Sequence, residues 1–250
     1  MSNEFGHWDT VQVAGHPCHL FEPAHPGQQG FVVLYLHGIG LGLLSDHPAF
    51  CREFARHGLR VIAPMSGQSW WSDRICADFD RKITTQRYLL DAVLPYISER
   101  WGSAPPQIGL LGISMGAQGG LRLAYKFPDT FPVVAAIAPA IDYQIRIEEG
   151  DPILTAMYGD AEQARQDTAT LHIHPLNWPR HQWFSCDPLD ARWHNSTDRL
   201  RMKLFSLGVP FECDLETSAG GHSWEYFDHM ADAAVGFLAE RLQQESRRVV

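Results

Sequence analysis

Several features that assign a protein to a function class at a glance are missing from this 250-residue sequence. No apolar run approaches the ~20 residues that a membrane-spanning helix needs. The five cysteines are dispersed and show no C-x-x-C spacing, which argues against a zinc site and a disulfide framework. An odd, scattered set predicts free thiols in a reducing compartment.

An excess of positive charge is also missing. The formal net charge of −9 argues against binding to nucleic acid or to an anionic membrane, because both require a basic face. The first ten residues, MSNEFGHWDT, lack the basic segment and apolar run of a secretory signal, so we expect a cytoplasmic protein. No phosphate-binding G-x-x-x-x-G-K or dinucleotide fingerprint occurs, so no cofactor is implied. The oligomeric state stays open, a homodimer included.

What is present is a core-forming α/β pattern. Apolar residues make up 45% of the chain, and short apolar runs alternate with amphipathic stretches, which predicts one domain over 1–250. We expect a mostly parallel central sheet with helices on both faces. The predicted strands are an edge hairpin over 10–21 and runs at 31–36, 59–63, 107–111, 133–138, 182–186 and 211–215. The predicted helices are 48–57, 83–100, 152–158, 161–168, 199–207 and 224–244, and the less regular stretch 140–178 is typical of a cap-like insertion.

The most informative stretch is Gln107 to Gly120, QIGLLGISMGAQGG. A buried strand leads into the G-x-S-x-G pattern around Ser114, and residues at helical spacing follow until Pro128. This order predicts a strand, a tight turn and a helix, with Ser114 at the corner. G-x-S-x-G also occurs by chance in glycine-rich turns, but a strand before it and a helix after it favour a catalytic serine.

A serine hydroxyl needs a base, and the base needs an acid that fixes its tautomer. In strand–turn–helix serine enzymes the partners follow in the order serine, acid, histidine. His222 lies in a glycine-flanked loop after the last predicted strand, where parallel sheets place their active sites. Asp187 and Asp190 both follow the preceding strand. We favour Asp190, because the chain can turn back toward a histidine from there, and Asp187 stays the alternative.

An acyl-transfer site also needs backbone N–H groups that hold the developing oxyanion. One predicted donor is the N–H of Met115, directly after the serine. The other should come from His37-Gly38-Ile39-Gly40 at the end of a buried strand. Within this segment Ile39 is the first choice and Gly40 the reserve.

Two further features invite a functional interpretation. Trp70 and Trp71 follow a strand end and are candidates for binding the acyl or aromatic part of a substrate, although tryptophan is also an ordinary anchor of loops. His172 and His174 form an H-x-H pair without a third ligand at convincing spacing, so we predict no metal site.

Four segments, VLYLHGIG, GISMGAQGG, CDPLD and GGHSWEYF, together resemble the esterase D-like branch of the α/β-hydrolases. That branch includes S-formylglutathione hydrolases, feruloyl-type esterases and mycolyltransferases. The resemblance covers about 31–238 and implies an α/β-hydrolase fold.

By position, the resemblance implies that Ser114 is the nucleophile, His222 the base, and Ile39 and Met115 the oxyanion donors. Asp190 aligns with the acid, while Asp187 replaces a glycine common in the family. Ile113 stands where S-formylglutathione hydrolases commonly have histidine, which argues against that particular substrate.

Together these features predict a serine esterase that cleaves carboxylic esters or thioesters of small molecules through an acyl-serine intermediate. Two alternatives remain. The same side chains could transfer the acyl group to an alcohol, or the chain could be a binding protein that shares the fold without catalysis.

Overall fold

The computed structural model describes residues 2–248. Within that range, nine strands form one sheet in the order β1-β2-β3-β5-β4-β6-β7-β8-β9. The strands are β1 (Ser2–Asn3), β2 (Gly6–Val13), β3 (His16–Pro23), β4 (Val32–Leu36), β5 (Arg60–Pro64), β6 (Ile108–Ile113), β7 (Val133–Ile137), β8 (His181–Ser185) and β9 (Glu212–Asp214).

The sheet is antiparallel at one side and parallel elsewhere. β1, β2 and β3 pair antiparallel, and β3 joins β5 in the same way. From β5 to β9 every pairing is parallel, so the carboxyl ends of these strands lie along one edge. β4, β6 and β7 are buried along their whole length, as apolar strands covered on both faces should be. The predicted mostly parallel sheet is confirmed.

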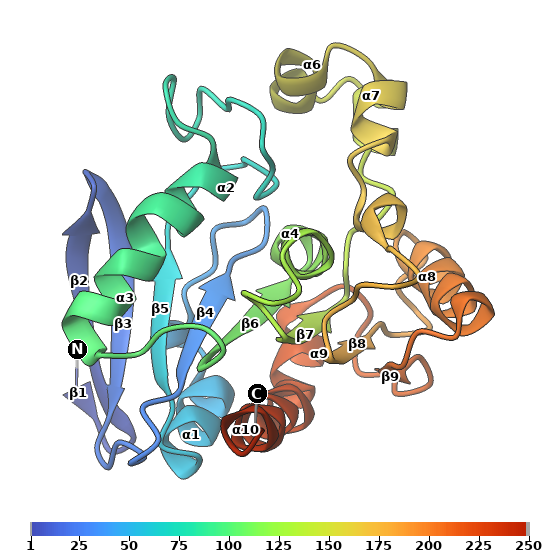
Figure 1. Cartoon of the computed structure of the whole chain (residues 1–250). Coiled ribbons are helices and arrows are strands. Elements are labelled where there is room, and N and C mark those ends of the chain that lie inside the picture. The colour runs from blue at the N-terminus through green and yellow to red at the C-terminus, as the bar shows by residue number, and fades with distance from the viewer. Residues whose placement is uncertain (1, 249–250) are drawn as a thin grey trace.

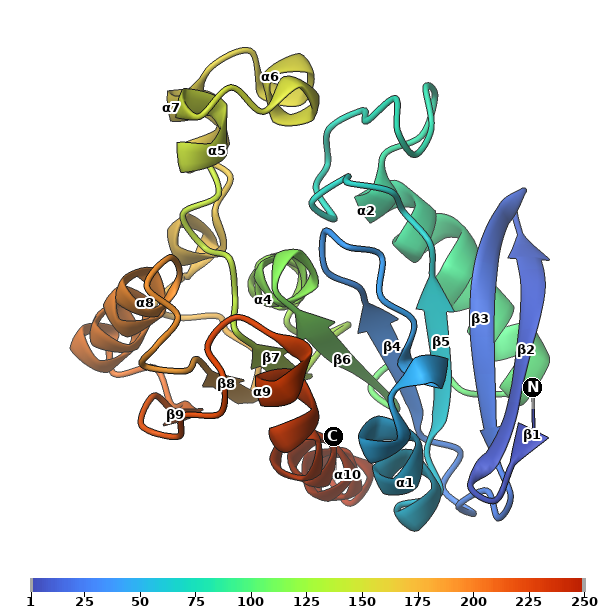
Figure 2. The same ribbon diagram turned by 180° about the vertical axis from the view of Figure 1, so that it is seen from behind.

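Helices cover both faces of the sheet (Figures 1 and 2). They are α1 (Pro48–Arg56), α2 (Thr85–Tyr88), α3 (Leu94–Trp101), α4 (Met115–Lys126), α5 (Ile145–Glu148), α6 (Pro152–Tyr158), α7 (Ala161–Arg165), α8 (His194–Leu207), α9 (Trp224–His229) and α10 (Ala231–Ser246). A Cβ on Gly109 of β6 would touch Leu238 and Leu242 of α10, whereas one on Gly112 would strike the backbone of α4. These two glycines point to opposite faces of β6, so α4 and α10 lie on opposite sides.

The predicted helix over 83–100 is present, but its hydrogen-bond pattern changes along its length. A π-helical turn, Leu89–Val93, separates α2 from α3, and the Leu94 N–H donates to the Leu89 carbonyl five residues back. Pro95 follows immediately and has no N–H to give to the ordinary helical ladder. The wider turn therefore stands where proline weakens that ladder.

Other boundaries also differ from the prediction. The closing helix predicted over 224–244 is divided at Met230 into α9 and α10. α8 begins at His194, five residues before the predicted start, because polar residues in its first turns hide the helical period. β1 was not predicted, and β2 begins at Gly6 rather than Thr10.

The irregular stretch 140–178 contains α5, α6, α7 and a 3₁₀ turn, Ala169–His172. In Figure 1 α6 and α7 rise away from the sheet, beyond the carboxyl ends of the strands. None of the helices in residues 2–248 has the length and apolar character needed to cross a membrane.

Candidate active site

Ser114 lies in a tight turn between β6 and α4. Its φ of 56° and ψ of −114° are a strained conformation for a residue with a side chain, the kind that recurs at functional sites. Neighbouring glycines make this turn sterically feasible. A Cβ on Gly112 would lie 2.2 Å from the Gly116 carbonyl oxygen, and one on Gly116 would lie 1.8 Å from the Leu36 carbonyl oxygen. The G-x-S-x-G spacing is therefore a packing requirement of this turn.

The turn is fixed by the neighbouring strand. The Ser114 N–H donates to the Ile137 carbonyl at the end of β7, and the Ser114 carbonyl accepts from the Ala140 N–H. Ser114 is only 8% exposed, so neighbouring residues cover most of its surface.

Ser114, His222 and Asp190 form one continuous hydrogen-bonded chain. His222 Nε2 lies 2.8 Å from Ser114 Oγ, and His222 Nδ1 lies 2.6 Å from Asp190 Oδ2. Asp190 is an acceptor when ionised, so Nδ1 carries the proton and Nε2 is free to accept one from the serine. The Phe227 ring stands edge-on to His222, with the ring centroids 5.3 Å apart. These contacts bring together the three side chains that the sequence singled out.

Asp190 is buried, and hydrogen bonds from the backbone fix the position of its carboxylate. Its Oδ1 accepts hydrogen bonds from the Arg192 N–H at 3.2 Å and the Trp193 N–H at 3.0 Å. Burial alone would raise the pKa of this carboxyl, but the His222 hydrogen bond and charge and the two backbone N–H groups outweigh it and lower the pKa. Asp190 is therefore ionised at neutral pH, as an acid that orients an imidazole must be.

Asp187, the alternative acid, takes a different role. Its carboxylate contacts the backbone N–H groups of Leu189, Ala219 and Gly221. The carboxylate at His222 Nδ1 is that of Asp190. The hydrogen-bond geometry thus assigns the contact with His222 to Asp190 and not to Asp187.

The segment after β4 is shaped by a buried histidine. His37 Nδ1 donates to the Gly38 carbonyl at 2.8 Å, and His37 Nε2 accepts from the Ser66 N–H at 3.1 Å. Burial lowers the pKa of His37 to about 4, so the ring is neutral at pH 7 in this tautomer. In a trans peptide the C=O and the next N–H point opposite ways. Because the Gly38 carbonyl turns toward His37, the Ile39 N–H turns away from that ring.

Both predicted oxyanion donors are near Ser114. Gly38 and Ile39 line the same pocket as Ser114, and a Cβ on Gly38 would lie 3.3 Å from Ser114 Cβ. Met115 is the first residue of α4, where the N–H has no acceptor within the helix. The positive end of the helix dipole adds to the attraction for an anion at this place.

A pocket of about 190 Å³ opens beside the serine. Its apolar wall is formed by Ile39, Ile113, Trp224 and Phe227. Trp224 is held by stacking on His47, with ring centroids 3.5 Å apart and planes inclined by 16°. Trp224 and Phe227 were not among the residues predicted to line a pocket. The sequence signal that could have identified them is their spacing of three residues in the helix after His222.

The predicted substrate role of Trp70 and Trp71 needs correction. Trp70 is 2% exposed and Trp71 is fully buried, so neither offers surface to a substrate in this structure. Trp71 Nε1 donates to the His37 carbonyl at 3.1 Å, and Trp70 stacks on Tyr143 with centroids 4.6 Å apart. Both rings are buried by packing, Trp71 against the segment after β4 and Trp70 against the stretch 140–178.

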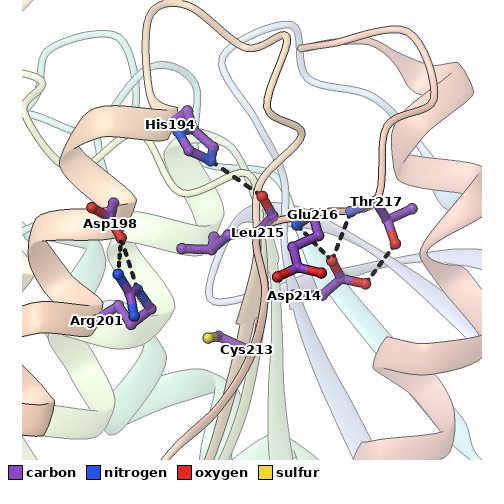
Figure 3. Close-up of a pocket in the computed structure, with 8 residues that line it drawn as sticks. All are labelled: His194, Asp198, Arg201, Cys213, Asp214, Leu215, Glu216 and Thr217. Atoms are coloured by element: carbon purple, nitrogen blue, oxygen red, sulfur yellow. Dashed lines mark hydrogen bonds and ion pairs between the residues drawn. The ribbon is translucent and has the colours of Figure 1, made fainter.

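No group of three or more metal-ligating side chains occurs among residues 2–248. His172 Nε2 instead pairs with Asp167 at 2.9 Å, and His174 Nδ1 accepts from the Leu176 N–H. A larger hollow, about 700 Å³, lies between α8 and the segment after β9 (Figure 3). It contains none of Ser114, His222 and Asp190.

A family model described as "Putative esterase" matches residues 19–238. A search of curated protein sequences finds no match.

Solved structures resemble the whole fold at low sequence identity. A substrate-bound fluorophosphonate-binding serine hydrolase F (FphF) from Staphylococcus aureus superposes with a TM-score of 0.75 at 15% identity, over 94% of this chain and 98% of that one. An S-formylglutathione hydrolase from Agrobacterium tumefaciens gives 0.76 at 16% identity, over 97% and 98%. A ferulic acid esterase gives 0.72 at 14% identity, over 94% and 98%. These similarities confirm the predicted α/β-hydrolase fold.

Proposed function

We propose that this chain, which belongs to the Esterase family and is a carboxylic ester hydrolase, works through an acyl-enzyme formed on Ser114. In this proposal His222 is the general base and Asp190 the orienting acid. The observation that carries the proposal is the pair of short hydrogen bonds that links these three side chains.

The first half-reaction makes the acyl-enzyme. Ser114 Oγ attacks the ester carbonyl carbon while His222 Nε2 takes the hydroxyl proton. The carbonyl oxygen becomes an oxyanion, which the N–H groups of Ile39 and Met115 stabilise. The carbon–oxygen bond to the leaving group then breaks, and His222 returns the proton to the departing alcohol. The acyl group stays on Ser114.

The second half-reaction releases the acid. A water molecule takes the place of the alcohol and gives a proton to His222 as it attacks the acyl carbon. Collapse of the second oxyanion frees the carboxylic acid and restores the Ser114 hydroxyl. Throughout both steps the Asp190 carboxylate keeps the proton on Nδ1 and stabilises the transient imidazolium.

The small pocket supports an ester with one compact apolar arm. Its volume of about 190 Å³ lies below the roughly 300–1,000 Å³ of pockets that enclose drug-sized ligands. The other arm of the ester would extend toward solvent. The insertion over 140–178 rises beyond the same edge of the sheet, and we propose that it borders this second arm as a cap (Figure 1).

The test is hydrolysis of a panel of p-nitrophenyl esters by the wild type and by Ser114→Ala. The proposal predicts loss of turnover in the variant with an unchanged circular dichroism spectrum and melting temperature. Turnover that persists in a pure, folded Ser114→Ala protein would refute it.

A further inference from the structure

Asp187 is a buried carboxylate that takes no part in the proposed mechanism, yet it connects the two loops that carry it. Its side chain is completely inaccessible to solvent. Oδ1 accepts the Leu189 N–H at 2.7 Å, within its own loop. Oδ2 accepts the Ala219 N–H at 2.7 Å and the Gly221 N–H at 2.8 Å, both from the loop after β9.

The positions of these donors are informative. Leu189 directly precedes Asp190, and Gly221 directly precedes His222. A single carboxylate therefore holds the backbone one residue before each member of the Asp190–His222 pair. The loops are also in close contact, because a Cβ on Gly221 would lie 3.5 Å from the Leu189 carbonyl oxygen.

We infer that Asp187 is a positioning residue, which sets the distance and alignment between Asp190 and His222 by clamping their two loops together. This inference rests on the proposed function, because it assigns Asp187 a role in the same reaction. Asp187 does not touch the reacting atoms. It acts through the backbone that carries the acid and the base.

The charge of Asp187 makes the clamp strong. A carboxylate is costly to bury unless hydrogen bonds compensate for the lost water. Burial raises the pKa of Asp187, but the three backbone N–H groups, together with a hydrogen bond from the Ser218 side chain, outweigh that effect and hold the pKa below its ordinary value. The ionised form is therefore the one that closes the clamp. Charge-assisted hydrogen bonds of this type are shorter and stronger than neutral ones.

Asp214 provides a natural comparison one strand away (Figure 3). It is the last residue of the parallel strand β9, and its carboxylate accepts the backbone N–H groups of Glu216 and Thr217 at 3.0 and 2.9 Å and the Thr217 hydroxyl at 2.7 Å. All of these bonds stay within its own loop. Asp214 thus shares the turn-capping chemistry of Asp187 without bridging the two loops, and Asp214→Asn is a matched control.

The experiment compares Asp187→Ala, Asp187→Asn and Asp214→Asn with the wild type. Readouts are kcat and KM on a p-nitrophenyl ester, the melting temperature, and the low-field proton resonance of the Asp190–His222 hydrogen bond. Displacing a catalytic group by about 1 Å costs on the order of 10²-fold in rate, so Asp187→Ala should lose about that factor in kcat with little change in KM. Its low-field resonance should broaden or shift.

Asp187→Asn keeps one carbonyl oxygen for the cross-loop bonds and should therefore retain more activity than Asp187→Ala. Asp214→Asn should keep kcat within about threefold of the wild type and leave the resonance in place, since the side-chain hydrogen bonds of Asp214 do not reach the Asp190 loop.

Wild-type kcat in a folded Asp187→Ala protein would overturn the inference, and so would a lower kcat with an unshifted resonance. If Asp187→Ala fails to fold, Asp187→Asn decides: its amide NH₂ cannot accept the Leu189 N–H, so a smaller loss of kcat with a shifted resonance is expected, and wild-type values of both would overturn the inference. Persistent turnover in Ser114→Ala would instead defeat the proposed function. The resonance would then still show whether Asp187 sets the Asp190–His222 geometry.

Discussion

Ser114 Oγ and His222 Nε2 lie 2.8 Å apart, although 108 positions separate the two residues along the chain. Parallel strands make this possible. Ser114 follows β6 and His222 follows β9, and both strands end at the same edge of the sheet. The distance is short enough for direct proton transfer, so the proposed chemistry requires no rearrangement of the backbone.

Asp190→Asn should leave the fold intact and lower kcat by ~10⁴-fold. The amide can keep its oxygen toward the Arg192 and Trp193 N–H groups and then presents its NH₂ to His222 Nδ1. Nδ1 must then accept, which moves the ring proton to Nε2 and leaves no acceptor for the serine proton. Steady-state kinetics and thermal melting measure the two effects. A kcat within tenfold of the wild type would remove Asp190 from the mechanism.

Two glycines of α4 should respond in opposite ways to alanine. A Cβ on Gly116 would lie 1.8 Å from the Leu36 carbonyl oxygen, so Gly116→Ala should destabilise the protein by ~3 kcal/mol or more. A Cβ on Gly120 has its nearest neighbours at 3.7 and 3.8 Å, which is ordinary contact. Gly120→Ala should therefore be neutral or stabilise by up to ~1 kcal/mol through helix propensity. Urea unfolding of both variants provides the comparison, and equal stabilities would contradict the steric account of the turn.

Asp167 should make stability depend on acid pH. It accepts from Arg122 Nε at 2.7 Å and the Tyr158 hydroxyl at 2.7 Å, and it pairs with His172. Burial alone would raise its pKa, but the His172 hydrogen bond, the Arg122 charge and the remaining hydrogen bonds lower it to about 2. The shift from 3.8 corresponds to about 2 kcal/mol of stability.

Because the folded pKa is the lower one, this stability is fully present above the unfolded pKa of about 3.9 and is lost as pH falls toward 2. The difference in unfolding free energy between the wild type and Asp167→Asn should be largest near pH 7 and shrink below pH 4. Asp129 is 92% exposed, so Asp129→Asn should give a small difference at every pH. A wild-type advantage over Asp167→Asn that is constant from pH 7 to pH 3 would count against the ion-pair account.

Trp224 should limit the length of one arm of the ester. The indole forms a wall of the pocket, and a Cβ on Gly42 would lie 2.3 Å from Trp224 Cζ2, so the ring has no room to move toward Gly42. Trp224→Ala should raise the octanoate-to-butyrate ratio of kcat/KM by on the order of tenfold, whereas Trp224→Phe should change it less. A second series with a constant acetyl group and varied alcohols shows which arm enters the pocket. Unchanged profiles in both series would exclude Trp224 as the wall that limits substrate size.

Much of the site could be predicted because its residues obey local rules. Gly112, Ser114 and Gly116 are spaced by the sterics of one tight turn, which any sequence that makes this turn must respect. His222 and Asp190 follow strands whose apolar runs are visible, so their common edge follows from parallel pairing. The preference for Asp190 over Asp187 depended on loop reach, and the hydrogen bonds agree with it.

The features that the sequence did not predict depend on contacts between distant segments. Trp70 and Trp71 occupy the same kind of loop as a substrate-binding aromatic would, and only the position of Tyr143 and His37 shows that both are packed inside. The clamp at Asp187 joins two loops more than thirty residues apart in the chain, so no local sequence pattern predicts it. The π-helical turn before Pro95 likewise needs the actual hydrogen-bond ladder to be recognised.

The central claim, an acyl group carried by Ser114, is tested most directly by trapping it. The protein is treated with a fluorophosphonate probe, digested, and analysed by peptide mass spectrometry, with Ser114→Ala and Asp187→Ala treated in parallel. We predict one adduct on Ser114 in the wild type, slower labelling in Asp187→Ala, and none in Ser114→Ala. An adduct on another residue, or an unlabelled Ser114 in a protein that still hydrolyses esters, would contradict the account.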